Sequence, residues 1–238
     1  MGCYDAQVIQ RITAIRLDEC GRIPLVGSNP TPALKGLETD LQTFGLSRQV
    51  ELAPDNRTKL VNGGTCSKPR GTPTDSGYSS TLTFCGGNPV FEAIVGYKTL
   101  DLFEGNIVGF EEVELTGATN VALEVIFKPS ADACEPGADP KCIALLIPML
   151  ESWIKSGEQN YNGNDVPDLA MTGTTRLNKN LFGNYLNDTE LPAYLAHWAP
   201  KFAAVGTGRA WTYTYLIDCP DDEGEHDPCQ LVALDEGS

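Results

Sequence analysis

Few side chains in this 238-residue chain could do chemistry, and only two of them are histidines, His197 and His226. Histidine is the commonest general base in nucleophilic catalysis. His226 lies between Glu225 and Asp227 in an acidic stretch, where we expect no packed shell to hold it in a triad. His197 stands beside Trp198, which is more typical of a structural histidine than of a catalytic one. The histidines therefore predict no catalytic site.

Three other motifs fall short of a reactive or ligand-binding signature. The stretch 63–68 contains glycines and a lysine but lacks the spacing of a phosphate-binding loop, and the oxygen-rich stretch 160–165 lacks a full calcium-loop signature. Glu111, Glu112 and Glu114 could form a glycosidase dyad, but nothing around them suggests a sugar cleft, and a solvated strand face is the better interpretation. We expect a binding or structural protein, not an enzyme, with no cofactor and no metal.

The eight cysteines contain no C-x-x-C pair, so the zinc ribbon and zinc finger patterns are absent. An even number suits a disulfide framework, although a reducing cytoplasm would keep the thiols free. Two pairs flank loops that contain proline and aspartate: Cys134 with Cys142, and Cys219 with Cys229. These two pairs are the candidate disulfides, which would form after release from the cytoplasm.

The formal net charge is −15, and the stretch 218–238 contributes eight acidic residues and no lysine or arginine. Proteins that bind the phosphates of nucleic acid are rich in lysine and arginine, so the excess of acidic residues argues against a nucleic-acid-binding protein. No apolar run approaches the ~20 residues of a membrane span, and the first residues lack the pattern of a secretory signal. We therefore expect a soluble protein that does not associate with membranes.

Alternating apolar and polar residues dominate the readable segments, and this period of two is typical of half-buried β-strands. One expected strand has Tyr78, Ser80, Leu82 and Phe84 on one face, opposite Ser79, Thr81, Thr83 and Cys85. Further strands are expected at 8–17, 44–52, 108–115, 121–127, 142–150, 168–177 and 209–217. The spacing favours a mainly β fold, an antiparallel sandwich or meander, over a parallel α/β fold.

One short flanking helix is expected at about 88–96, where Asn88 and Pro89 suit a helix start and Gly96 a helix end. A less regular helical pattern covers 189–200. The length predicts a single domain over 1–217, followed by an acidic C-terminal tail over 218–238.

The segment 53–77 lacks a core pattern, and unstructured loops of this length usually have a function. Its basic residues outnumber its acidic ones: Arg57, Lys59, Lys68 and Arg70, against Asp55 and Asp75. One interpretation is a solvated loop. The other is a protruding arm attracted to an acidic partner, with Leu60 and Val61 buried in the contact.

Several stretches carry a resemblance to a known family: ITAIRLDECGRIP at 12–24, NGGTC at 62–66, FCGGNP at 84–89 and ALEV at 122–125. Together they resemble the major tail proteins, or tail tube proteins, of long-tailed bacteriophages that infect actinobacteria. The resemblance covers roughly residues 3–127 and extends more loosely to about 217.

The resemblance implies a β-sandwich subunit of the virion, assembled in the bacterial cytoplasm into six-membered rings that stack into a non-contractile tail tube. The sheets of neighbouring subunits would join into one inner β-barrel, whose lumen conducts double-stranded DNA without specific binding. Other expected partners are the tape measure protein and the tail terminator and distal tail proteins. Segment 53–77 would be an arm that lies on a subunit of the adjacent ring. An acidic lumen would repel phosphates, and Glu112, Glu114 and Glu124 are the candidates to line it.

Two other classes remain open. A secreted, disulfide-stapled β-sandwich for adhesion would explain the eight cysteines, but we would expect it to carry a signal peptide. A hydrolase with an unrecognised site is the other.

Overall fold

The structure, a computed structural model, describes residues 7–24, 34–38, 41–51, 57–59, 65–67, 74–84, 89–103, 106–112, 119–129, 141–156, 169–191, 193–219 and 232–233. The strands are β1 (Gln7–Arg16), β2 (Leu34–Glu38), β3 (Leu41–Glu51), β4 (Arg57–Lys59), β5 (Thr65–Ser67), β6 (Thr74–Phe84), β7 (Lys98–Phe103), β8 (Asn106–Glu112), β9 (Val121–Pro129), β10 (Lys141–Ser156), β11 (Leu169–Thr175), β12 (Tyr213–Asp218) and β13 (Val232–Ala233). The helical turns are α1 (Pro89–Ile94), η2 (Asp188–Glu190), η3 (Ala193–Lys201) and α2 (Phe202–Gly206).

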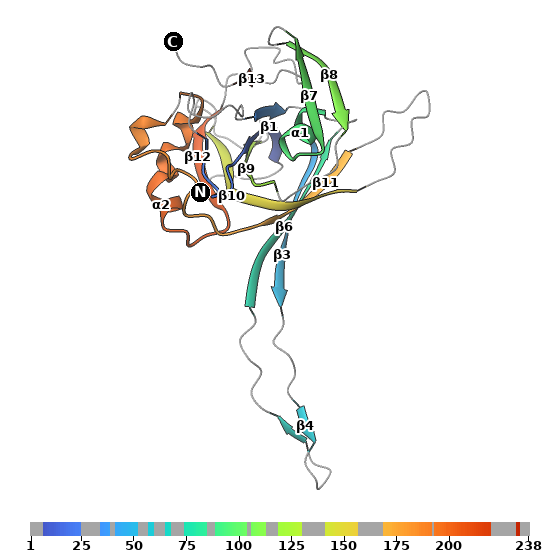
Figure 1. Cartoon of the computed structure of the whole chain (residues 1–238). Coiled ribbons are helices and arrows are strands. Elements are labelled where there is room, and N and C mark those ends of the chain that lie inside the picture. Colours follow the sequence, from blue (N-terminus) through green and yellow to red (C-terminus); the bar gives the residue numbers. More distant parts are fainter. Residues whose placement is uncertain are drawn as a thin grey trace.

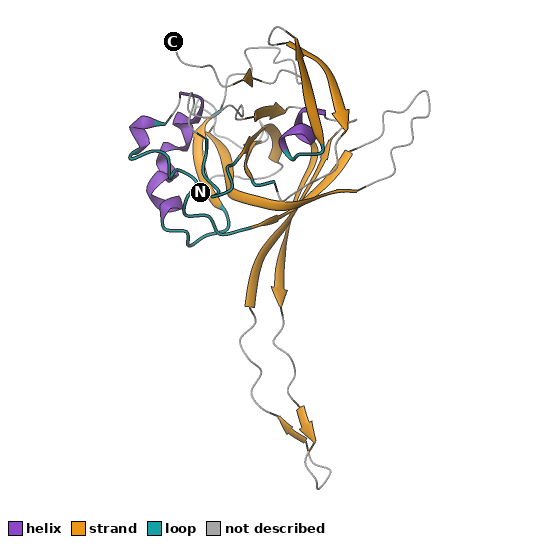
Figure 2. Cartoon of the chain, in the orientation of Figure 1, coloured by secondary structure: helices purple, strands orange, loops and turns teal. Residues whose placement is uncertain are grey.

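Most strands form one nine-stranded sheet, in which eight strands follow the order β13-β2-β1-β9-β10-β11-β6-β3 and the ninth, β12, pairs with β10. The long strand β10 pairs with β9 along one edge, and along the other edge first with β12 and then with β11. Every strand pair is antiparallel, including the separate hairpins β4–β5 and β7–β8 (Figure 2). The predicted mainly β, antiparallel fold is confirmed.

The sheet curls strongly. Strands β3 and β9 are four positions apart in the sheet order, which would separate them by roughly 19 Å in a flat sheet. The rings of Phe44 on β3 and Phe127 on β9 nevertheless have centroids only 6.0 Å apart. The curl brings β3 back towards the strands at the other side of the sheet and creates a concave inner face.

The concave face holds the first of two cores, here called the inner core. Alternate residues of the curled strands point into it, for example Val121, Leu123 and Val125 of β9. Helix α1 packs there as well (Figure 1), and the ring of its Phe91 lies 4.9 Å from Phe84 and 5.4 Å from Trp153.

The convex face carries the outer core, which residues 176–212 cover as a layer between β11 and β12. We call this segment the outer layer; it contains η2, η3 and α2 and lies to the left in Figure 1. Its buried side chains pack on the residues of β9 that point outward: Leu181, Phe182, Leu191, Leu195, Trp198 and Val205, over Ala122 and Ile126. Asn178 anchors the layer, because its amide group donates to the carbonyls of Gly21 (2.7 Å) and Pro148 (3.1 Å).

The helix expected at 88–96 is present as α1 and ends as its sequence predicts. Gly96 adopts a positive φ of 92°, and its N–H donates to the carbonyl of Ala93 (3.2 Å). The N–H of Tyr97 donates to the carbonyl of Glu92 (2.8 Å), which completes a Schellman end. The second expected helix, 189–200, is instead two 3₁₀ segments, η2 and η3, with Pro200 inside the latter.

The disulfide in the structure differs from both predicted pairings, because Cys142 is bonded to Cys219. Strands β10 and β12 are antiparallel neighbours, and Cys142 lies opposite Ile217, two residues before Cys219. The Cα atoms of the two cysteines are therefore only 4.9 Å apart, although 77 positions separate them in the chain. The prediction from short loops was wrong because strand pairing brought distant residues together. Cys134 and Cys229 lie outside the described residues.

Two further observations concern the ends of the predicted domain. Strand β13 falls within the predicted acidic tail and pairs with β2, and the tail's first residue, Asp218, forms an ion pair with Lys141. Within the described residues, no helix is long and apolar enough to cross a membrane.

Candidate functional site

The convex face of the sheet has two halves with different chemistry. The half formed by β1, β9 and the first part of β10 is covered by the outer layer, and the side chains beneath it are mostly apolar, as at Ala122, Ile126 and Ala144. The half formed by β3, β6 and β11 has Thr43, Ser47 and Thr81 exposed to solvent. The change in chemistry coincides with the end of the covering layer.

The open half is built as three rungs that cross β3, β6 and β11. Strand pairing places Ser47 beside Ser79 and Thr174, Gly45 beside Thr81 and Thr172, and Thr43 beside Thr83 and Ala170. We call these nine residues the hydroxyl face. Seven of them carry hydroxyl groups, and none is charged.

The opposite side chains of the same strands explain why these residues point outward. Leu82 and Phe84 alternate with the β6 hydroxyl residues and are buried in the inner core. On β11, Met171 alternates with the hydroxyl residues and is buried in the inner core, and Gly173 leaves room for the ring of Trp153. Because side chains alternate along a strand, burying these residues turns their neighbours to the convex side.

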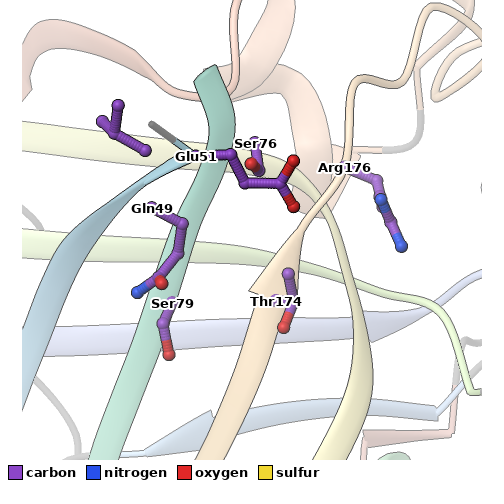
Figure 3. A pocket seen from close by; sticks show the side chains of 7 residues that line it. Gln49, Glu51, Ser76, Ser79, Thr174 and Arg176 are labelled. Carbon is purple, nitrogen blue, oxygen red and sulfur yellow. The ribbon is translucent and has the colours of Figure 1, made fainter. Parts of the chain in front are cut away.

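An open hollow of about 430 Å³ lies at one end of the hydroxyl face. Figure 3 shows Ser79 and Thr174 at its floor, with Gln49, Glu51, Ser76 and Arg176 around it. It forms where the pairing of β3 with β6 shifts register between Gln49 and Val50. Its lining combines hydroxyl, amide, carboxylate and guanidinium groups with the side chain of Val50.

Two ion pairs lie near this end of the three strands, and Arg48 alternates with the hydroxyl residues of β3, so its side chain lies on the other side of that strand. Arg48 donates to Asp75 at 2.8 Å, and Arg176 donates to Glu151 at 2.5 Å. The hydrogen bond from Arg48, together with one from the N–H of Gly77, lowers the pKa of Asp75. The nine residues of the rungs themselves carry no charge.

The predicted lumen carboxylates lie in different environments. Glu124 is 0% exposed and accepts a hydrogen bond from the hydroxyl of Tyr215 in the outer core, so its prediction as a lumen residue was wrong. Apolar neighbours under the outer layer, which sequence alternation alone does not reveal, cause this burial. Glu112 is exposed and lies 3.5 Å from Lys155, while Glu114 lies outside the described residues.

The other predicted site residues fall largely where the structure gives little detail. Arg57 and Lys59 belong to strand β4, which pairs with β5 as a short hairpin inside the segment expected to be a loop. The remaining arm candidates lie outside the described residues: Leu60, Val61, Lys68 and Arg70. Strand β6 begins at Thr74, so the ordered pairing with β3 reaches into the predicted arm.

The chemical groups at the hollow are those of its lining residues. The hollow contains serine and threonine hydroxyls beside the carboxylate of Glu51 and the guanidinium group of Arg176, and its lining includes no histidine, lysine or cysteine. Among the described residues, no three His, Cys, Asp or Glu side chains are grouped so that they could hold a metal ion.

The alternation on 78–85 was predicted from the sequence, but a hydroxyl row shared with the neighbouring strands was not. Thr43 and Ser47 of β3, and Thr172 and Thr174 of β11, repeat the same alternation. The signal was present in each strand, and only the strand order could join the three rows into a surface.

No protein-family model matches the sequence, and no curated protein matches it significantly.

Proposed function

We propose that the chain is a tube-forming structural subunit, the major tail tube protein of a long-tailed, non-contractile bacteriophage. The resemblance of residues 3–127 to that family supports the proposal. The subunits would form six-membered rings that stack into a tube for double-stranded DNA, alongside the tape measure, tail terminator and distal tail proteins. The role is architectural and involves no catalytic step.

The observation that carries the proposal is the open edge of the curled sheet. Strand β3 ends the sheet, and within the described residues only β6 pairs with it. An exposed strand edge invites pairing with another chain, and natural proteins usually cover or pair it. A ring in which each β3 edge receives a strand of the next subunit would remove these edges and give a continuous barrel. The concave side of the curl is filled by the inner core, to which α1 contributes Phe91 and Ile94.

The ribbon formed by β3 and β6 supports the contact between rings. The lower ends of both strands run beyond the body of the subunit in Figure 1, and the β4–β5 hairpin lies further out. In this proposal, the hairpin and its flanking basic residues lie on a subunit of the adjacent ring. Exposed ion pairs stabilise weakly, at ~0–1 kcal/mol each, so charge would direct the arm while Leu60 and Val61 hold it by burial.

Electron microscopy of the purified chain tests the proposal. We expect rings or hollow filaments of uniform width, formed by head-to-tail contacts around a closed axis. Monomers or two-fold dimers alone, at high concentration and with the other tail proteins added, would contradict it.

A paired substitution tests the arm separately. Replacing Arg57 and Lys59 by serine should leave a folded subunit that forms tubes only at low salt. The control replaces two exposed basic residues of the outer layer, Lys179 and Arg209, by serine and removes the same charge. Equal tube growth by both variants would show that Arg57 and Lys59 do not join rings.

One observation favours a second candidate, a secreted adhesion or binding module. The Cys142–Cys219 disulfide is typical of proteins that mature in an oxidising compartment. A virion protein could oxidise after lysis, so the two candidates differ in assembly rather than in cysteine state. A monomer that carries the disulfide and never forms rings would favour the adhesion module.

A further inference from the structure

We propose that the free edge of β12 is the surface on which the next copy of the chain docks its strand β3. The inference rests on the proposed function and deepens it, because it names the strand that receives each β3 edge. Its basis is that β12 has an unpaired edge, an exposed leucine and a firm attachment to the rest of the sheet.

The unpaired edge of β12 is the first observation. All six residues of the strand pair with β10, and within the described residues no other strand pairs with them. Strand β11 pairs with a later part of β10, so it does not cover the outer edge of β12. The strand at the far end of the sheet order, β13, has only two residues and offers a much shorter edge. The edge of β12 therefore presents a row of backbone N–H and C=O groups to another chain.

An apolar row that ends at this edge is the second observation. Strand pairing places Leu216 beside Ile143, and Ile143 beside Phe127. Phe127 and Ile143 are half-buried, whereas Leu216 at the end of the row is 58% exposed. A strand added to β12 would continue the row and remove Leu216 from water, which favours association.

The attachment of β12 is the third observation. The Cys142–Cys219 disulfide links the end of the strand to β10, and the hydroxyl of Tyr215 donates a buried hydrogen bond to Glu124. Because side chains alternate along a strand, anchoring Tyr215 in the outer core turns Leu216 to the other side, where it is exposed. A strand that is already held in place loses little conformational entropy when a partner binds.

Strand β3 is the partner that fits this edge. It has eleven residues, and within the described residues only β6 pairs with it. Its exposed Val50 lies on the same side of the strand as Phe44 and Leu46, which pack on the inner core. Leu216 shares its side of the sheet with Phe127, which also packs on the inner core. Pairing of β3 with β12 would therefore bring the exposed apolar side chains of both strands to one face.

The two edges belong to different parts of the chain, which makes the contact head-to-tail. In Figure 1, β12 lies at the left of the body, and the lower part of β3 leaves the body below. A contact between β3 of one copy and β12 of the next leaves each copy a second edge for another neighbour, so it can close into a ring. A contact between two β12 strands would instead end at a two-fold dimer.

Photo-crosslinking tests the strand pair in the assembled full-length chain. Benzoylphenylalanine in place of Leu216, in rings or tubes made from a mixture of isotope-labelled and unlabelled chains, should join this position to residues 41–51 of a different chain. The control carries the same group in place of Leu186, which is 90% exposed in the outer layer. The control should give no link to residues 41–51.

Two outcomes would overturn the inference and leave the chain able to associate. Rings in which position 216 is joined to another segment would keep the proposed function and reject β3 as the partner. Links between two β12 strands would reject it in favour of a two-fold contact. A chain that forms no rings or tubes would remove the proposed function and this inference with it.

A substitution tests how much the apolar contact contributes. Leu216→Asp should raise the chain concentration needed for assembly by about tenfold or more, because burial of a leucine side chain favours association by at least that factor. The matched control, Leu186→Asp, introduces the same charge at another exposed leucine and should assemble as wild type does. Light scattering measures assembly, and circular dichroism shows whether both variants are folded.

Equal assembly by the two variants would overturn the inference. If Leu216→Asp does not fold, Leu216→Ala removes the apolar contact without adding a charge, and it should still assemble less readily than Leu186→Ala. Equal assembly by the two alanine variants would likewise overturn the inference.

Discussion

The phenol hydroxyl of Tyr215 on β12 donates a hydrogen bond to the carboxylate of Glu124 on β9, across the intervening strand β10. Both residues are buried, at 7% and 0% exposure. Burial, the nearby negative charge of Glu124 and this hydrogen bond all raise the pKa of Tyr215 above its ordinary value. The hydrogen bond links β12 to β9 near the centre of the sheet. It also keeps the carboxylate of Glu124 in the protein interior, away from solvent.

Tyr215→Phe should lower the free energy of unfolding by about 1–3 kcal/mol, because a buried carboxylate loses a hydrogen-bond donor. Urea denaturation followed by circular dichroism measures the change. The matched control is Tyr213→Phe, whose hydroxyl donates to the carbonyl of Ala204 at an exposed site (3.1 Å). The control should lose ~1 kcal/mol or less, because water can replace the lost donor. Equal losses in both variants would contradict a structural role for the buried pair.

The stability should fall as pH rises above ~10, the ordinary pKa of a tyrosine in an unfolded chain. In the folded state Tyr215 keeps its proton beyond that pH, because its pKa is raised, so the unfolded state binds fewer protons and gains stability. Below this range the contribution is fully present. Burial also raises the pKa of Tyr185, so part of the slope should remain in Tyr215→Phe. Denaturation curves between about pH 9 and 11 that are parallel for wild type and Tyr215→Phe would show the assignment to be wrong.

The disulfide should stabilise the folded chain by about 4 kcal/mol in the chain-entropy model, because it closes a separation of 77 residues. The variant Cys142→Ala with Cys219→Ala should lose that amount, and reduction of the wild type should give a similar loss. Peptide mapping without reductant should recover the fragment joining Cys142 to Cys219. A recovered link between Cys134 and Cys142 would instead support the pairing predicted from the sequence.

Lys155→Met should destabilise the fold by about 3 kcal/mol, because it removes the ammonium group that lies 2.8 Å from the buried carboxylate of Glu92. Burial lowers the pKa of Lys155, but the carboxylates of Glu92 and Glu112 outweigh it and raise the pKa overall. Arg48→Met is the control, since Arg48 and Asp75 form an exposed pair whose loss should cost only ~0–1 kcal/mol. Thermal melts of both variants give the comparison, and a larger loss for Arg48→Met would contradict it.

Gly77→Ala should destabilise the sheet beside the hollow by more than about 1 kcal/mol, because Gly77 has a φ of 99° and a Cβ there would meet the hydroxyl of Thr175 at 2.6 Å. Gly45→Ala is the control on the neighbouring strand, where no atom lies within 4 Å of the added Cβ. The control should be neutral or stabilising by ~0.5–1 kcal/mol, since alanine restricts the unfolded chain. Urea denaturation that ranks the two variants in the opposite order would disprove this account.

The sequence by itself determined the local elements of this protein. Alternation predicted the strands, because a strand that buries one face needs a period of two. Pro89 and Gly96 bounded α1, since each favours its own end of a helix through backbone geometry alone. The alternation of two faces on 78–85 was also visible as a pattern within one strand.

Only the tertiary structure decided which of these local features meet. The Cys142–Cys219 bond, the burial of Glu124 and the joining of three hydroxyl rows all depend on which strands are neighbours in the sheet. Strand order follows from the packing of two cores on opposite faces, and such packing involves residues far apart in the chain. Alternation fixes the two sides of a strand, but it does not say whether a side will face solvent or a covering layer. Residues 176–212 supplied that layer over one half of the convex face and left the hydroxyl half open.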